Sequence, residues 1–122
     1  MVKSVLILCD KGPFGTNSAV EALRLGAGIM GLGDGISCKI LFYGDGVLAL
    51  KKGLAADKIG VDPLDEAFEL GDLTEMPLAV MKDDLASRGL TEGDLVEYAN
   101  LSWLSRSELA ALIEANEMTF HV

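Results

Sequence analysis

The stretch Val5-Leu6-Ile7-Leu8-Cys9, followed by Asp10-Lys11-Gly12-Pro13-Phe14-Gly15-Thr16, decides the fold of this 122-residue chain. Five consecutive apolar residues predict a strand that is buried on both faces, as in a parallel sheet. The loop after it contains two glycines and a proline, which end the strand. In an open α/β sheet, the loop at the carboxyl end of a strand is where ligands bind.

The rest of the chain alternates further strands with amphipathic helices. Strands are expected at residues 36–43, 77–81, 95–98 and 118–122, and helices are expected to begin at Ser18, Val47, Asp62, Asp83 and Ser105. Ser18 with Glu21, and Ser105 with Glu108, match the capping-box pattern. Asp62 is expected to cap the helix that has Pro63 in its first turn, and Gly71 to follow the end of that helix. The alternation predicts one α/β domain over residues 1–122, with a five-stranded, mainly parallel sheet.

The composition restricts the function classes. A net charge of −9 disfavours direct binding to nucleic acids and to anionic membrane surfaces. Half of the residues are hydrophobic and the mean hydropathy is +0.35, which indicates apolar surface buried between subunits and so a homo-oligomer. We find no signal peptide, no apolar run that could span a membrane and no disulfide pattern, so we expect a cytoplasmic protein.

Cys9 is the candidate nucleophile, since it ends the first strand beside Asp10 and Lys11. Lys11 and the following helix would lower the pKa of its thiol, whereas Asp10 opposes this effect. A buried, inert cysteine is the more common arrangement and is the favoured interpretation here. Cys38 lies early in the second predicted strand, away from the site edge, and is interpreted as structural.

Four segments are expected to converge at the carboxyl edge of the sheet, namely residues 9–16, 44–47, 81–84 and 99–103. Asp45 is most simply a turn residue, and Asp83 and Asp84 suit the first turn of a helix. Lys11 could hold an anionic group such as a persulfide or a carboxylate. The predicted pocket is lined by Lys11, Gly12, Pro13, Gly15, Thr16, Asp45, Gly46, Met81, Lys82 and Asp83.

Neither a metal nor a cofactor is predicted. His121 is the only histidine, which argues against hydrolytic triads and histidine-rich metal sites. The Gly-x-Gly-x-x-Gly motif of dinucleotide-binding sites is matched by Gly26-Ala27-Gly28-Ile29-Met30-Gly31. This segment, however, lies at the end of a predicted helix. No helix N-terminus would therefore face a phosphate there.

Several segments together resemble the DsrE/DsrF/DsrH family of small sulfur-relay proteins, which includes the TusB, TusC and TusD subunits. They are the loop at 11–16, the helix with Glu21-Ala22-Leu23-Arg24-Leu25, the strand end at 42–47 and the segment 79–90 with its Arg88-Gly89 turn. The resemblance implies a three-layer α/β/α fold with a five-stranded parallel sheet. It also implies oligomers, with trimers or hexamers favoured over dimers, or assembly with partner subunits of the same family.

The active branch of that family carries sulfur as a persulfide on a cysteine, for sulfur oxidation or tRNA thiolation. The resemblance implies that this cysteine would fall at Met81, whose thioether cannot form a persulfide. We therefore expect a non-catalytic or accessory oligomeric protein linked to intracellular sulfur relay. Two alternatives remain: a module that binds a small anion or another small molecule, and a persulfide-carrying sulfurtransferase that uses Cys9.

Overall fold

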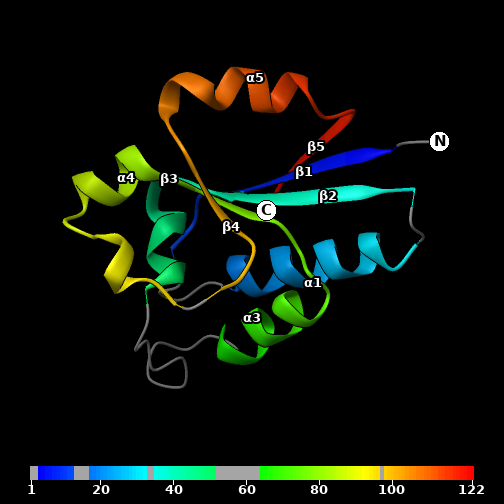
Figure 1. Ribbon diagram of the computed structural model, residues 1–122, viewed down its shortest axis with the longest axis horizontal. Coiled ribbons are helices and arrows are strands. Elements are labelled where there is room, and N and C mark those ends of the chain that lie inside the picture. The colour runs from blue at the N-terminus through cyan, green and yellow to red at the C-terminus, as the bar shows by residue number, and fades with distance from the viewer. Residues whose placement is uncertain (1–2, 13–16, 33–34, 52–63, 97) are drawn as a thin grey trace.

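A five-stranded parallel sheet organises the chain, as a computed structural model shows (Figure 1). The structure describes residues 3–12, 17–32, 35–51, 64–96 and 98–122. The strands are β1 (Ser4–Cys9), β2 (Ser37–Phe42), β3 (Leu78–Met81), β4 (Leu101–Leu104) and β5 (Met118–His121). Their order in the sheet is β4-β3-β2-β1-β5, and every neighbouring pair is parallel. The predicted α/β fold with a five-stranded parallel sheet is confirmed.

The helices divide unequally between the two faces of the sheet. They are α1 (Ser18–Met30), α3 (Leu64–Leu73), α4 (Lys82–Ser87) and α5 (Leu109–Glu114), with the 3-10 segments η1 (Gly44–Leu50), η2 (Glu92–Asp94) and η3 (Arg106–Glu108). Figure 1 shows α1 and α3 on one face and α5 alone on the other. The steps from β1 to β4 all run in one direction across the sheet, whereas the return to β5 runs in the opposite direction. Right-handed crossovers therefore place α5 on the opposite face.

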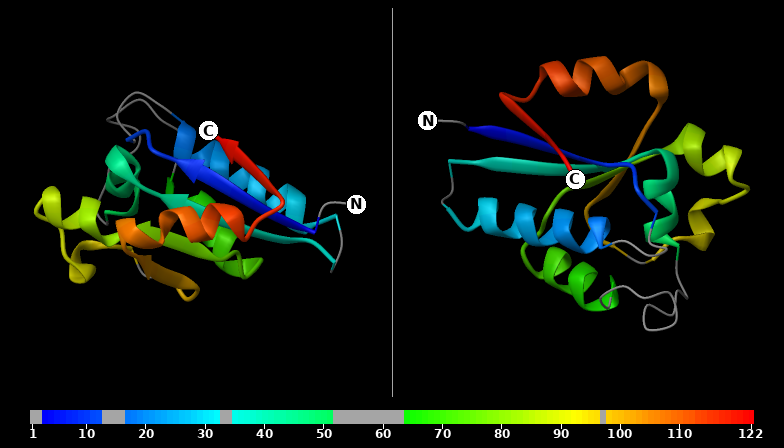
Figure 2. Two further views of the ribbon diagram at one scale, coloured as in Figure 1. Left: turned by 90° about the horizontal axis from the view of Figure 1, so that it is seen from above. Right: turned by 180° about the vertical axis from the view of Figure 1, so that it is seen from behind.

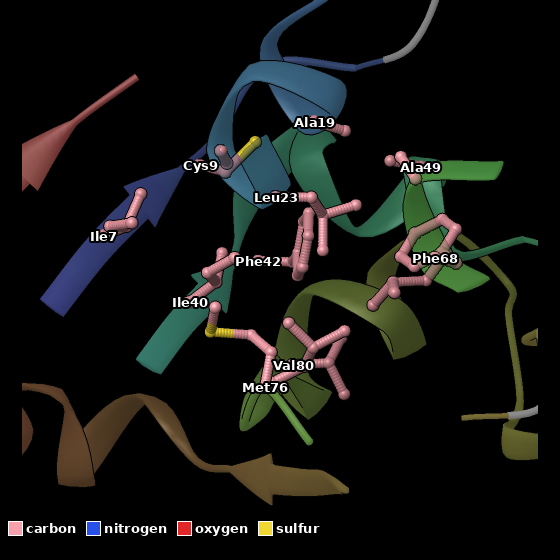
Figure 3. Close-up of a cluster of buried hydrophobic side chains, with 14 of the residues drawn as sticks. Ile7, Cys9, Ala19, Leu23, Ile40, Phe42, Ala49, Phe68, Met76 and Val80 are labelled. Carbon is pink, nitrogen blue, oxygen red and sulfur yellow. The ribbon is translucent and has the colours of Figure 1, made fainter. Parts of the chain in front are cut away.

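The larger core lies between the sheet and the α1–α3 layer (Figure 3). Phe68 from α3 lies between Phe42 of β2 and Tyr98, with ring centroids 6.4 and 6.3 Å apart. On the other face, a second cluster contains Leu6, Leu41, Ala79 and Met81 with Leu109 and Leu112 of α5 packed against it. Because α5 has six residues and none of them is buried, this second face is thinly covered.

The turn after β2 packs directly on the end of β1. A Cβ atom added to Gly46 would lie 2.2 Å from the carbonyl oxygen of Cys9, so only glycine fits there. Gly44 begins the same turn with a φ of +53°, a conformation that also favours glycine. The Gly44-Asp45-Gly46 sequence thus allows β1 and the turn to approach at backbone distance.

The fourth strand was predicted wrongly at residues 95–98, because it lies at Leu101–Leu104. Leu95 makes an isolated antiparallel bridge with Lys51, and the hydroxyl of Tyr98 donates a hydrogen bond to the carbonyl oxygen of Met76 at 2.7 Å. Leu95 and Tyr98 therefore lie outside the sheet, and Tyr98 packs beside Phe68 of α3. The chain joins the sheet only after the turn at 99–100, where Leu101 aligns with Leu78 of β3.

Two predicted helix ends are also corrected. Gly71 lies inside α3, and its missing side chain admits Tyr98, whose hydroxyl would be 2.7 Å from an added Cβ. Ser18 is the first residue of α1, and the N-cap is Asn17, so the first capping box is not formed. The second is formed, since the N–H of Ser105 donates to Glu108 at 2.9 Å. The predicted cap at residues 62–63 lies outside the described residues.

None of the helices in the described segments is long and apolar enough to cross a membrane.

We predict that Gly46→Ala lowers the free energy of unfolding by about 1–3 kcal/mol, because its methyl group would collide with the Cys9 carbonyl. Gly28→Ala in α1 is the matched control, since an added Cβ there meets no atom within 4 Å. It should stabilise the helix by about 0.5–1 kcal/mol. Urea unfolding measures both changes, and equal effects of the two substitutions would contradict the predicted collision.

Candidate functional site

The candidate site lies between the carboxyl ends of β3 and β4. After β3 the chain enters α4, whose Leu85 packs in the larger core, whereas after β4 it enters η3 and α5 on the opposite face. The two connections therefore leave neighbouring strands in opposite directions. Open α/β sheets bind ligands outside the strand ends at such a point. Figure 2 shows β4 as the outer strand of the sheet on this side.

Asp84 is the central side chain of this region. It is buried, and its Oδ2 accepts a hydrogen bond from the N–H of Gly44 at 2.7 Å while its Oδ1 pairs with the guanidinium of Arg106. The side chain of Asp84 is 8% exposed and that of Arg106 is 63% exposed. A buried carboxylate needs such partners to offset its desolvation. The arrangement joins the ends of β2, β3 and β4 and holds a solvent-exposed cation above them.

Asp45 and Arg88 form a second ion pair beside the first. The Nε and Nη2 atoms of Arg88 lie 3.2 and 2.8 Å from Oδ1 of Asp45, and Nη1 donates to the carbonyl oxygen of Asp84 at 3.1 Å. Because the carboxylate of Asp45 is largely exposed, the pair contributes modestly to stability. It nevertheless orients the turn that carries Gly44 toward Asp84.

The structure brings together only part of the predicted pocket. Gly12 lies against the turn after β2, since its added Cβ would be 3.4 Å from the carbonyl oxygen of Asp45. Met81 is buried as the last residue of β3, whereas Lys82 and Asp83 are exposed at the start of α4. Lys11 is exposed, Gly46 is buried against Cys9, and Pro13, Gly15 and Thr16 lie outside the described residues.

Both cysteines are free thiols inside the larger core. Burial raises the pKa of Cys9 to about 11, with Asp10 adding to the effect while a backbone hydrogen bond at Lys11 and the charge of Lys11 oppose it. Burial alone raises the pKa of Cys38 to about 11. Figure 3 places Cys9 beside Ala19 and Leu23 of α1. Both thiols are therefore protonated at neutral pH and shielded from reagents.

His121 and Asp10 form a pair at the carboxyl ends of β5 and β1, with Nε2 and Oδ1 2.8 Å apart. His121 aligns with Leu8, which packs on the α5 face, whereas the neighbouring Cys9 packs on the α1 face. Successive strand residues point to opposite faces, so the imidazole and the thiol lie on opposite sides of the sheet. This geometry does not make His121 a base for Cys9.

The described residues contain no group of three or more histidine, cysteine or acidic side chains arranged to hold a metal ion.

Sequence reasoning missed Asp84 and Arg106 as partners. Asp84 was interpreted only as a residue of the first helical turn. With the fourth strand placed at 95–98, the predicted site edge fell at 99–103, and Arg106 lay beyond it. The apolar residues Leu101, Trp103 and Leu104 directly before the Ser105 capping box are the signal that could have located both the strand and its carboxyl end.

Comparisons with known proteins agree with this architecture. A family model described as the DsrE/DsrF-like family matches residues 3–120. The chain is 33% identical over 115 residues to the intracellular sulfur oxidation protein DsrF of Allochromatium vinosum, covering 93% of this chain and 83% of that protein. Among solved structures, the ychN protein from E. coli aligns with a TM-score of 0.77 at 17% identity, covering 98% of this chain and 99% of that one. A protein of unknown function from Methanobacterium thermoautotrophicum aligns with a TM-score of 0.62 at 13% identity over the full length of both chains. The two structural similarities show the fold.

We predict that Asp84→Ala lowers the free energy of unfolding by about 1–3 kcal/mol, because it leaves the Gly44 N–H without its acceptor and releases Arg106. Asp83→Ala is the control, as the neighbouring carboxylate is exposed in the same helical turn. Its effect should stay within about 0.5 kcal/mol. Urea unfolding compares the two, and an Asp84→Ala protein as stable as Asp83→Ala would contradict the bridging role.

We also predict that neither cysteine of the native protein is alkylated by iodoacetamide at pH 8. The reaction needs the thiolate, and a pKa of about 11 keeps each thiol protonated until the pH approaches that value. In denaturant, where the pKa returns to its ordinary value, both cysteines should react quickly. Mass spectrometry counts the modified thiols, and rapid labelling of Cys9 in the native state would contradict its burial.

Proposed function

Because this chain belongs to the DsrE/DsrF-like family, we propose that it is an accessory, non-catalytic component of an intracellular sulfur-relay system. The relative from Allochromatium vinosum is named an intracellular sulfur oxidation protein, and its similarity extends over nearly the whole chain. This similarity supports the pathway class and a cytoplasmic location. The residue at position 81 is the observation that carries the non-catalytic assignment.

Sulfur relay through a persulfide requires a thiolate. The thiolate attacks the terminal sulfur of a donor, a new S–S bond forms, and the donor's S–S bond breaks with the shortened donor leaving as an anion. Met81 stands where the family resemblance implies the active cysteine, and its thioether has no ionisable proton. Cys9 and Cys38 are buried thiols with raised pKa values. These properties support an accessory function over a carrier function at Cys9.

The exposed apolar side chains support the proposed assembly with other subunits. Ile113, Met118 and Phe120 are each 37–38% exposed, and none of the residues of α5 is itself buried. We expect a homo-oligomer, a trimer or hexamer before a dimer, or assembly with partner subunits of the same family. Burial of these side chains in contacts between subunits would remove them from water.

A small anionic ligand is the second candidate function. Lys82, the residue after Met81, lines a hollow of about 360 Å³, and Arg106 has an exposed guanidinium that pairs with Asp84. Two cations near a strand edge suit a carboxylate or a sulfur oxyanion. In this reading the protein binds the anion without chemical change.

We predict that the wild-type protein gains no sulfur atom when it is incubated with inorganic polysulfide, because none of its three candidate sulfur-bearing side chains supplies an accessible thiolate. Met81→Cys places a thiol at the implied relay position. Met81 is itself buried, but cysteine is shorter than methionine and leaves space at this strand end, so the variant should gain one sulfur atom, whereas Met81→Ser should gain none. Intact mass spectrometry before and after reduction identifies the added sulfur.

A sulfur atom that maps to Cys9 in the wild type would overturn the accessory assignment and establish a relocated carrier. Light scattering on the same samples measures the oligomeric state. A monomer that also fails to assemble with a cysteine-bearing family member would contradict the proposed subunit role.

A further inference from the structure

The outer edge of β4 is available to another strand. β4 is the end strand of the sheet, and among the described residues it pairs only with β3 (Figure 2). The N–H of Leu78 donates to the carbonyl of Asn100 at 2.9 Å. In a parallel pair, the backbone groups of successive residues point alternately toward and away from the partner strand, so this bond shows which residues of β4 face β3. Backbone groups of Ser102 and Leu104 therefore face β3, and those of Trp103 face outward. An open edge of this kind can pair with an extended peptide.

Three hollows join along this end of the molecule into one track, which we call the Trp103 groove. The central hollow, of about 740 Å³, shares Glu92 and Trp103 with the hollow of about 360 Å³ on one side. It shares Asp72 and Ala99 with a hollow of about 520 Å³ on the other side. A track of joined hollows suits an extended ligand better than a compact one.

Two hydrogen bonds hold the wall of the groove in place. The N–H of Ala99 donates to Oδ1 of Asp72 at 3.1 Å, and the Tyr98 hydroxyl donates to the Met76 carbonyl at 2.7 Å. The track also presents apolar side chains to solvent, since Leu73 is 83% exposed and Trp103 is 37% exposed. Large apolar and aromatic side chains on a fixed wall are typical anchors of a protein interface.

The charge of the groove identifies the kind of partner. Glu69, Asp72 and Glu92 contribute carboxylates to the two larger hollows, whose described lining residues include no lysine or arginine. Lys82 lies at the far end, in the smallest hollow. A second copy of this chain would bring a further net charge of −9 to an acidic surface. Charge complementarity therefore favours a different, basic partner.

We propose that the Trp103 groove binds an extended basic segment of a partner protein, which adds as a strand to the free edge of β4. Lysine or arginine side chains of the segment lie near Glu69, Asp72 and Glu92, and its alternate apolar side chains contact Trp103 and Leu73. This interaction is independent of any sulfur transfer, because it uses the edge strand and α3 and none of the three sulfur-bearing positions discussed above.

Trp103 is the only tryptophan of the chain, so its fluorescence reports directly on the groove. The probe is a short capped peptide of alternating lysine and valine, without aromatic residues, and the control peptide replaces each lysine by glutamate. We expect the lysine peptide to change the Trp103 emission saturably and with an affinity that falls as salt is added. We expect no response to the glutamate peptide.

Paired variants test the charge argument. Glu69→Gln with Glu92→Gln should raise the Kd of the lysine peptide by about three- to tenfold. Glu114→Gln with Glu117→Gln removes the same charge from exposed positions at the end of α5 and just before β5, and should leave the Kd nearly unchanged.

Three results would overturn the proposal: no saturable response, equal binding of both peptides, or equal Kd values for the two double variants. An emission that changes with the concentration of the protein alone would also overturn it, because a second copy would then occupy the groove. None of these outcomes affects the sulfur-uptake or light-scattering measurements, so the two proposals fail separately.

Discussion

The handedness of the crossover connections constrains this molecule more than any single contact. Four strands follow one another in one direction across the sheet, and right-handed connections place α1, α3 and α4 on a common face. The last connection must then cross back on the other face, where α5 is the single helix available. One face is therefore deeply covered and the other thinly covered. Because of this reversal, the connections after β3 and β4 leave toward opposite faces of the sheet, and the candidate site lies between these two strand ends.

Asp84 connects the segments that meet at this site. Its carboxylate is buried and accepts from the turn after β2 while it pairs with Arg106 beyond β4. The pair is asymmetric, because the carboxylate is enclosed and the guanidinium is open to water. Its contribution is therefore mainly to position the strand ends and to present a fixed cation, since an ion pair with an exposed partner adds little net stability. Met81 is the last residue of β3, three residues before Asp84.

The Cys9 thiol and the His121–Asp10 pair lie on opposite faces of the sheet, because successive strand residues point to opposite sides. Cys9 faces the α1 core, whereas His121 and Asp10 lie toward the α5 face. Residues that are neighbours in sequence are thereby kept from acting together, and the thiol is removed from water. The Trp103 groove lies at the other edge of the sheet and involves neither group.

The sequence by itself determined the fold class and most of the elements. The apolar runs at 5–9 and 77–81 indicated buried parallel strands, because such strands have no solvent face and need no alternation. The glycines at 44 and 46 indicated a tight turn, and the Ser105 box located the start of the last helical segment correctly. The family resemblance, carried by motif order and spacing, was confirmed over residues 3–120.

Only the tertiary structure decided which residues meet. Leu95–Tyr98 has the composition of a strand, yet Tyr98 is bound to Met76 and Phe68, and the apolar residues that follow pair with β3. Asp84 and Arg106 are 22 residues apart, and Asp10 and His121 are 111 apart, so no local pattern links either pair. Local propensity depends on neighbouring residues along the chain, whereas burial and ion pairing depend on distances that exist only after the sheet has formed.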